Sequence, residues 1–164
     1  MSLLSGLAPI ADSHTRLLVL GSFPGVKSLQ LQQYYAHPQN QFWRILGTSW
    51  DQPLQQLDYA GRCQQALAHG LGIWDVYASC EREGSLDSAI RNATVNDFVG
   101  LAQRSPQLQA IAHNGGESWR HQRHTRTLGL PVYRLPSTSP ANASWSFERK
   151  LQAWREVLAA HGLA

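Results

Sequence analysis

The sequence contains only two cysteines, Cys63 and Cys80, and neither lies in a CxxC motif or at the His and Cys spacing of a metal site. This scarcity argues against zinc or iron–sulfur ligation and is typical of proteins in a reducing compartment. The sequence also has no uncharged apolar run of about 18 residues, and its N-terminus lacks a basic region followed by a long apolar core. We therefore expect a soluble, cytoplasmic protein with no metal and no membrane partner.

Charged residues are scarce as well. Asp, Glu, Lys and Arg make up 15% of the 164 residues, the net charge is +3, and the pI is about 9.1. A basic balance is compatible with an anionic partner such as nucleic acid, although it does not identify one. Because Lys and Arg are few, we expect contacts with phosphate to use backbone N–H groups, Ser and Gln as much as basic side chains.

The length is that of one domain, residues 1–164, which is long enough to bury a sizeable core. Residues 1–15 are predicted to be an entry segment without chemistry and residues 80–85 a polar connection, while Ser85 and Asn96 are expected to cap two helices. Strands are expected at residues 16–21, 72–78, 108–113 and 131–135, and helices at 40–47, 59–69, 86–91, 96–104, 117–128 and from 147 onward. This alternation predicts an α/β fold with three α/β/α layers around a central, mostly parallel four-stranded sheet.

Residues 16–43 contain the strongest indication of a site. The unbroken apolar run at residues 17–20 is typical of a central parallel strand, and Gly21 and Gly25 bracket a turn that Pro24 stiffens. Ligands of open α/β sheets bind beyond the carboxyl ends of the strands. The segment that follows, residues 34–43, mixes aromatic rings with amides, which suits stacking and edge recognition of a flat polar heterocycle.

A purely structural interpretation exists for each candidate. The apolar residues of 42–46 also fit the core stripe of a short helix that Asn40 caps. Asp75 can face the site or can be a hydrogen-bonded residue at a strand end. The basic residues of the helix at 117–128 can follow phosphates or can simply be solvated.

Three segments, GSFPGVKSL, QYYAHPQNQFW and LPSTSPANASWSFERKLQAW, together resemble the hypoxanthine-DNA glycosylase (DNA-deoxyinosine glycosylase) family of the uracil-DNA glycosylase superfamily. The resemblance spans nearly the whole chain in the same order. It implies a single α/β/α domain that removes a deaminated base from DNA, hypoxanthine being the expected base, without a metal or other cofactor. A monomeric enzyme of base excision repair is expected.

The resemblance also implies the roles of single residues. Asn40 corresponds to the catalytic asparagine, Phe23 to the aromatic residue that stacks on the base, and Asn114 to the asparagine that recognises the base edge. His113 replaces the aromatic residue that usually precedes this asparagine, and Leu135 stands where many relatives have a histidine. The loop at residues 136–143 corresponds to the one that pushes the nucleotide out of the helix, and its small polar residues are expected to anchor the strand: Ser137, Ser139 and Asn142.

From these residues we expect Asn40 to position a water molecule, while N–H groups near Ser22 and Phe23 stabilise charge on the departing base. Lys27 has no catalytic role in this family, so the enzyme is expected to be monofunctional, without lyase activity.

Two alternatives stay open. The enzyme could be specific for uracil, or the chain could be a noncatalytic nucleic-acid-binding domain in which Asn40 is only a helix cap. A dinucleotide oxidoreductase fits poorly because the first strand is not followed by GxGxxG.

Overall fold

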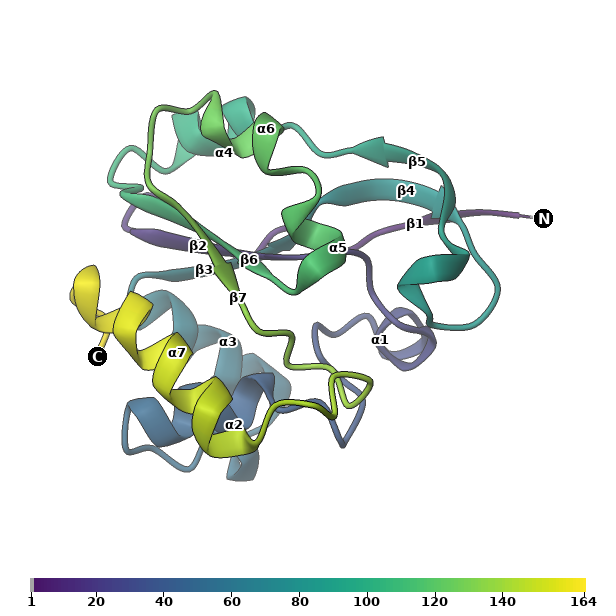
Figure 1. Ribbon diagram of the computed structural model, residues 1–164. Coiled ribbons are helices and arrows are strands. Elements are labelled where there is room, and N and C mark those ends of the chain that lie inside the picture. The colour runs from purple at the N-terminus through teal and green to yellow at the C-terminus, as the bar shows by residue number, and fades with distance from the viewer. Residues whose placement is uncertain (1) are drawn as a thin grey trace.

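The computed structural model describes residues 2–164 and contains a central parallel sheet (Figure 1). The order of its strands is β3-β2-β6-β7, and every neighbouring pair is parallel. The strands are β2 (Leu17–Gly21), β3 (Leu71–Asp75), β6 (Ala110–Asn114) and β7 (Val132–Leu135). This arrangement confirms the predicted four-stranded sheet and brings the carboxyl ends of these strands to one edge.

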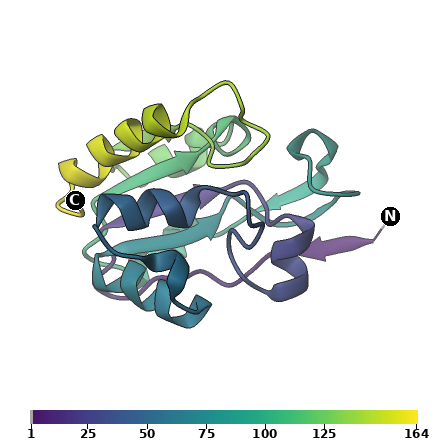
Figure 2. The ribbon, with the colours of Figure 1, turned by 90° about the horizontal axis from the view of Figure 1, so that it is seen from below.

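Helices cover both faces of the sheet, which completes the predicted three layers (Figures 1 and 2). α2, α3 and α7 lie on one face, and α4 and α6 lie on the other. The helices are α1 (Val26–Leu31), α2 (Phe42–Ser49), α3 (Tyr59–Ala68), α4 (Phe98–Arg104), α5 (Gly116–Trp119), α6 (Gln122–Arg126) and α7 (Phe147–Ala160), and the 3-10 turns are η1 (Leu54–Gln56) and η2 (Asp87–Ala89).

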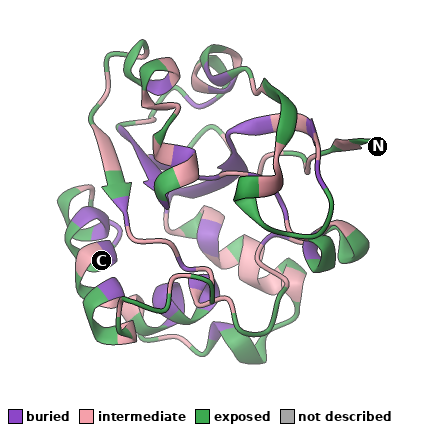
Figure 3. Ribbon diagram, turned by 45° about the vertical axis from the view of Figure 1, so that its right-hand side comes forward, coloured by how far each residue is buried: buried purple, intermediate pink, exposed green. Residues whose placement is uncertain are grey.

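Burial follows from this layering. All residues of β2, β3 and β6 are buried, as expected for strands covered on both faces, and they form the purple centre of Figure 3. The closing helix α7 begins at its cap Ser146, whose hydroxyl accepts a hydrogen bond from the Arg149 N–H, and it buries Trp154 completely. The Trp154 indole packs edge-on against Phe42 and donates a hydrogen bond to the Pro136 carbonyl. The helix is thereby fixed to the loop that follows β7.

The single strand predicted at residues 72–78 is wrong, because the chain changes sheets after Asp75. Val76 still donates a hydrogen bond to the Gly21 carbonyl, and then β4 (Tyr77–Glu81) pairs antiparallel with β1 (Leu3–Ser5) and β5 (Arg91–Val95). β1 and β5 were not predicted, and β4 occupies part of the expected connection at 80–85. β5 is almost entirely exposed, so it lacks the alternation of apolar residues that marks a strand in sequence.

Several helix boundaries also differ from the prediction. The helix expected at 86–91 is only the turn η2, and the helix expected at 117–128 is split into α5 and α6. Ser85 caps no helix of its own and instead accepts a hydrogen bond from the first N–H of α1, at Val26. Asp97 rather than Asn96 caps α4. α2 continues past Gly47, where a side chain would collide with the Gln52 carbonyl.

Within residues 2–164, no helix has the length and apolar character needed to cross a membrane.

The burial of Trp154 leads to a prediction about stability. Trp154→Ala removes a fully buried indole and its hydrogen bond, and we expect the free energy of unfolding to fall by about 3–5 kcal/mol. Val99→Ala, on an exposed position of α4, is the matched control and is expected to change it by less than about 0.5 kcal/mol. Urea unfolding of the three proteins measures both values. A loss below about 1 kcal/mol in Trp154→Ala would contradict the packing described.

Candidate active site

A cavity of about 510 Å³ lies at the carboxyl edge of the central sheet. Its floor consists of the ends of β2, β3 and β6, at Gly21, Asp75 and Asn114. Its walls come from residues 22–28, 85–88 and 137–141 and from four residues of the segment between α1 and α2, Tyr34, Tyr35, His37 and Asn40. A hollow of this size at this place suits a small organic group.

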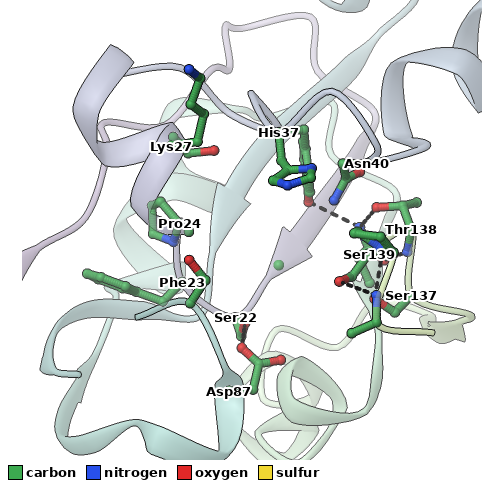
Figure 4. Close-up of a pocket in the computed structure, with 18 of the residues that line it drawn as sticks. Ser22, Phe23, Pro24, Lys27, His37, Asn40, Asp87, Ser137, Thr138 and Ser139 are labelled. Carbon is green, nitrogen blue, oxygen red and sulfur yellow. Dashed lines mark hydrogen bonds between the residues drawn. The ribbon is translucent and has the colours of Figure 1, made fainter. Parts of the chain in front are cut away.

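The cavity brings together most of the site residues that the sequence predicted. Ser22, Phe23, Asn40, Asn114, Ser137 and Ser139 all line it. Figure 4 places Phe23 and Pro24 on one side and Ser137–Ser139 on the other, with Asn40 beside the latter. Asn142 is the exception, because it lies in an adjoining hollow and donates a hydrogen bond to the Ser137 carbonyl. Its contact with the loop supports Ser137 rather than the cavity itself.

Asn40 is half-buried, at the end of a tight turn that begins at His37. The Asn40 N–H donates to the His37 carbonyl, and the Asn40 side-chain oxygen accepts a hydrogen bond of 3.0 Å from the N–H of Phe42, the first residue of α2. The side chain therefore does satisfy the start of the helix, as the structural alternative expected. A carboxamide oxygen has two lone pairs, so Oδ1 retains one acceptor position for another partner.

The carboxamide of Asn114 joins three segments of the site. Its Nδ2 donates to Thr138 Oγ1 at 3.1 Å and to Tyr35 Oη at 3.2 Å, while its Oδ1 accepts from the Thr138 N–H at 3.1 Å. Both amide hydrogens are thus directed at protein acceptors. In this structure Asn114 holds the loop after β7 and the Tyr35 phenol in place, and recognition of a base by Asn114 stays a prediction.

Tyr35 is one of several aromatic residues in the segment 34–43, and the structure fixes both its backbone and its ring. Its φ of +55° lies in the left-handed region, which is uncommon for an aromatic residue. The ring stacks on Phe42 with the centroids 4.0 Å apart. The phenol consequently lies on the cavity wall, beside Gly21 and Asn114.

The ring of Phe23 is 7% exposed and is directed away from the middle of the cavity in Figure 4. Arg82 lies under it, with the guanidinium carbon 5.3 Å from the ring centroid, and donates a hydrogen bond to the Pro24 carbonyl. Arg82 therefore fixes the turn between β2 and α1. As placed, residue 23 presents its backbone to the cavity, and stacking of its ring on a base stays a prediction.

The sequence does not indicate the wall at residues 85–88, and it leaves open whether Asp75 faces the site. Asp75 lines the cavity and is 5% exposed, and its buried oxygen Oδ2 has no hydrogen-bond partner in residues 2–164. Burial, and to a smaller extent the nearby Asp87, raise the pKa of Asp75, and Arg82 opposes them; the result is a pKa of about 7. The wall is joined to the first turn because Ser22 donates a hydrogen bond to Asp87.

His113 does not line the cavity. Its two ring nitrogens lie 2.8 Å from the hydroxyls of Ser118 and Thr125, on the side of α5 and α6. Burial lowers the pKa of His113 to about 4, so the ring is neutral near pH 7. Replacement of the family's usual aromatic residue by His113 thus changes the packing behind β6 and leaves the wall of the cavity unaltered.

Several basic residues around α5 and α6 form contacts with other side chains of the protein. Arg120 forms an ion pair with Glu117 at 3.0 Å, and the Arg126 guanidinium lies over the Trp119 ring. His121 is within 2.7 Å of the Tyr77 hydroxyl. These contacts favour the structural interpretation of that segment. In residues 2–164 no group of three His, Cys, Asp or Glu side chains is placed to hold a metal ion.

Comparisons with known proteins identify relatives over nearly the whole chain. A family model for the uracil DNA glycosylase superfamily matches residues 8–158. Proteins named hypoxanthine DNA glycosylase from Methanosarcina acetivorans and Methanosarcina barkeri are 36% and 35% identical over 152 residues, which is 93% of this chain and 96% of each relative. The solution NMR structure of a candidate uracil DNA glycosylase from Methanosarcina acetivorans superimposes with a TM-score of 0.87 at 34% identity, covering 97% of this chain and 98% of that one.

The buried position of His113 predicts how stability depends on pH. Because its pKa is about 4 when folded and 6.5 ordinarily, the unfolded chain binds the proton more readily, and stability is lost as the pH falls below 6.5. We expect the free energy of unfolding to drop by about 2 kcal/mol more in the wild type than in His113→Gln between pH 7 and pH 5. Urea unfolding at the two pH values measures this difference. An equal drop in both proteins would show that His113 does not stay neutral in the folded state.

Proposed function

This chain belongs to the uracil DNA glycosylase superfamily, and we propose that it is a monofunctional DNA glycosylase that hydrolyses the N-glycosidic bond of deoxyinosine and releases hypoxanthine. We further propose that it acts as a monomer in the cytoplasm, with one domain over residues 1–164. The observation that carries this proposal is the cavity in which Asn40 and the turn after β2 converge, in a chain similar along almost its full length to proteins named hypoxanthine DNA glycosylase.

The target nucleotide must leave the double helix to reach the cavity, which costs a few kcal/mol and least at a mispaired base. Asn40 lies toward the mouth, where the sugar of an extruded nucleotide would rest. In our proposal, Asn40 Oδ1 uses its remaining lone pair to hold the water that attacks C1′. The electron pair of the broken bond to C1′ passes to the base, and the attacking water releases its proton to solvent.

Negative charge on the departing base needs hydrogen-bond donors. The backbone N–H groups of Ser22 and Phe23 donate to no acceptor in residues 2–164, and both residues line the cavity. Donors that are fixed in position stabilise charge without reorganisation during the reaction. A neutral amide is a poor general base, so this site needs a base that leaves readily, and hypoxanthine and uracil are better leaving groups than ordinary bases.

Ser137 and Ser139 supply small polar groups on the wall opposite the first turn. The hydroxyl of Ser137 accepts the Ser139 N–H, and the hydroxyl of Ser139 accepts the Ala141 N–H, so the loop is fixed by its own side chains. Such a loop suits close approach to phosphate, since most protein contacts with DNA go to phosphate oxygens and sugar. We assign it, with Asn142 supporting it from behind, to the strand that carries the extruded nucleotide.

Uracil is the second candidate base. It presents the same lactam edge as hypoxanthine, a carbonyl next to an N–H, and the matched solution structure is described as a candidate uracil DNA glycosylase. The noncatalytic alternative rests on the hydrogen bond between Asn40 and Phe42, which is what a simple helix cap would make.

One assay separates these possibilities. Purified protein is incubated, with chelator present, with oligonucleotides that carry one deoxyinosine or one deoxyuridine, and abasic sites are quantified by alkaline cleavage. We expect release of hypoxanthine, strands that stay intact until alkali is added, and a loss of at least about 100-fold in Asn40→Ala, because the attacking water is no longer held. Gln39→Ala, an exposed neighbour, is the control and should retain activity within about twofold.

Asn40→Ala removes a helix-capping contact worth about 1 kcal/mol, so a thermal unfolding scan must show that the variant is folded. Excision that survives in folded Asn40→Ala would remove Asn40 from the mechanism. Preference for deoxyuridine would keep the site and change the substrate. Saturable DNA binding without release of either base would establish the noncatalytic alternative.

A further inference from the structure

Side chains of the cavity lie at different depths. Asp75 and Asn114, at the strand ends, are 5% and 8% exposed, whereas Asn40 is half-buried and His37 is exposed at the mouth. A nucleotide that enters with its sugar near Asn40 must therefore direct the far edge of its base toward Asp75. This inference rests on the proposed function.

The Asp75 carboxyl is held at the floor by close packing. A methyl group on Gly21 would lie 2.5 Å from Asp75 Oδ1 and 3.1 Å from the Tyr35 hydroxyl, so only glycine leaves room for both. The Asp75 carbonyl is also fixed, since it accepts a hydrogen bond from Asn96 Nδ2. Asn114 directs both of its amide hydrogens at Tyr35 and Thr138, so its side chain offers no further N–H to a base.

No cation compensates this carboxyl by an ion pair in residues 2–164. An isolated carboxylate in such surroundings is costly, and a buried carboxyl group instead keeps its proton. A carboxylate would also repel the electrons that accumulate on the departing base, whereas a neutral carboxyl can donate a hydrogen bond to them.

We propose that Asp75 is a second catalytic residue, whose neutral carboxyl donates a hydrogen bond to the deepest acceptor atom of the extruded base. On hypoxanthine this edge offers O6 and N7, and charge grows on both while the bond to C1′ breaks. The donor is thus needed most in the transition state, where an interaction accelerates the reaction. Asp75 takes no proton from the attacking water; Asn40 holds that water, which loses its proton to solvent as the bond to C1′ forms.

Other titratable or charged groups face Asp75 or share its cavity. The acidic Asp87 comes from η2 and the basic Arg82 from the end of β4, and the phenols of Tyr34 and Tyr35 come from the segment before α2. Lys27 and His37 line the same cavity. The raised pKa of Asp75, about 7, is consistent with a neutral carboxyl at slightly acidic pH.

Single-turnover rates with excess enzyme on a deoxyinosine duplex, measured from pH 5.5 to pH 8, test this role. We expect the wild-type rate to fall about tenfold between pH 6 and pH 8, as the carboxyl ionises. Asp75→Asn keeps a neutral donor, so its rate should change by less than about twofold over the same range. Asp75→Ala lacks the donor and should be at least about tenfold slower than Asp75→Asn at pH 6.

The same variants can fail in distinguishable ways. If the wild type releases no hypoxanthine, the proposed function itself is refuted. A pH profile that is the same in Asp75→Asn as in the wild type would overturn the role of Asp75 and leave the proposed function intact. A rate that rises with pH and needs the aspartate would do the same. At pH 8 Asp75→Asn should also unfold at a higher temperature than the wild type, because it removes a buried charge; a lower midpoint would contradict the burial argument.

A separate observation concerns the rim of the cavity. Leu86 lines the cavity, and 64% of this residue is exposed, so a large apolar side chain stands at the rim. The loop that presents it is held firmly: Arg82 binds the Pro24 carbonyl, Ser85 binds the Val26 N–H, and Asp87 binds Ser22. On the opposite rim, residues 137–141 carry only Ser, Thr, Pro and Ala.

Extrusion of a nucleotide leaves a gap in the base stack, and proteins that distort DNA fill such gaps with apolar side chains such as leucine. The geometry points to Leu86 as the side chain that enters the duplex beside the extruded nucleotide, while the Ser-rich loop holds the backbone. The expected partner is therefore duplex DNA, and a single strand does not need this contact.

Excision from duplex and single-stranded deoxyinosine substrates distinguishes this role from a structural one. Leu86→Ala should lose at least about tenfold on the duplex and less than about twofold on the single strand, and Leu86→Met should recover most of the loss. Val99→Ala, also exposed but outside the cavity, is the control. Equal losses on both substrates, or none on the duplex, would overturn the inference, whereas a wild type inactive on both would instead refute the proposed function.

Discussion

The hydrogen bonds of the Asn114 carboxamide are the constraint on which the site depends. They join the end of β6 to Thr138 and to Tyr35, and the Thr138 carbonyl in turn accepts the N–H of Gln41, next to Asn40. Lys150 on α7, itself 2% exposed, donates to the Gln41 side chain. One buried amide thus sets the relative positions of the segment that carries Asn40 and of the loop after β7, to which we assign catalysis and DNA binding. A small cavity with a rigid frame of this kind keeps its groups oriented.

The second determinant is the change of sheet after β3. The chain leaves the parallel sheet after Asp75, forms β4 in the antiparallel sheet, and returns as the loop at 82–88, which becomes a wall of the cavity. Arg82 is buried under the Phe23–Pro24 turn and links this wall to the floor. The same departure exposes the carboxyl of Asp75 to the cavity. This side of the cavity, where we place the extruded base, is therefore built by the part of the fold that departs from a plain α/β/α arrangement.

Sequence reasoning was most reliable where burial alone decides structure. The sequence alone predicts β2 and β6 from their continuous apolar runs and α7 from its apolar stripe of 3.6-residue period. The glycines after β2 likewise indicate the floor of a site. The segment around Asn40 was recognisable from its amides and rings. β5 and the loop at 85–88 were missed because exposed residues carry no periodic pattern. The environment of Asp75 could not be predicted either, since its burial and its lack of a partner depend on residues distant in sequence, such as Tyr35 and Asp87.

The central claim is that an extruded deaminated base occupies this cavity with its sugar at Asn40. A crystal structure of the protein with a duplex that carries a nonhydrolysable deoxyinosine analogue tests it most directly. The account predicts the hypoxanthine ring between the first turn and the Ser137–Ser139 loop, with C1′ nearest Asn40 and the far edge of the base nearest Asp75. A base that stays stacked in the duplex, or that binds outside the cavity while Asn40 contacts only α2, would contradict it.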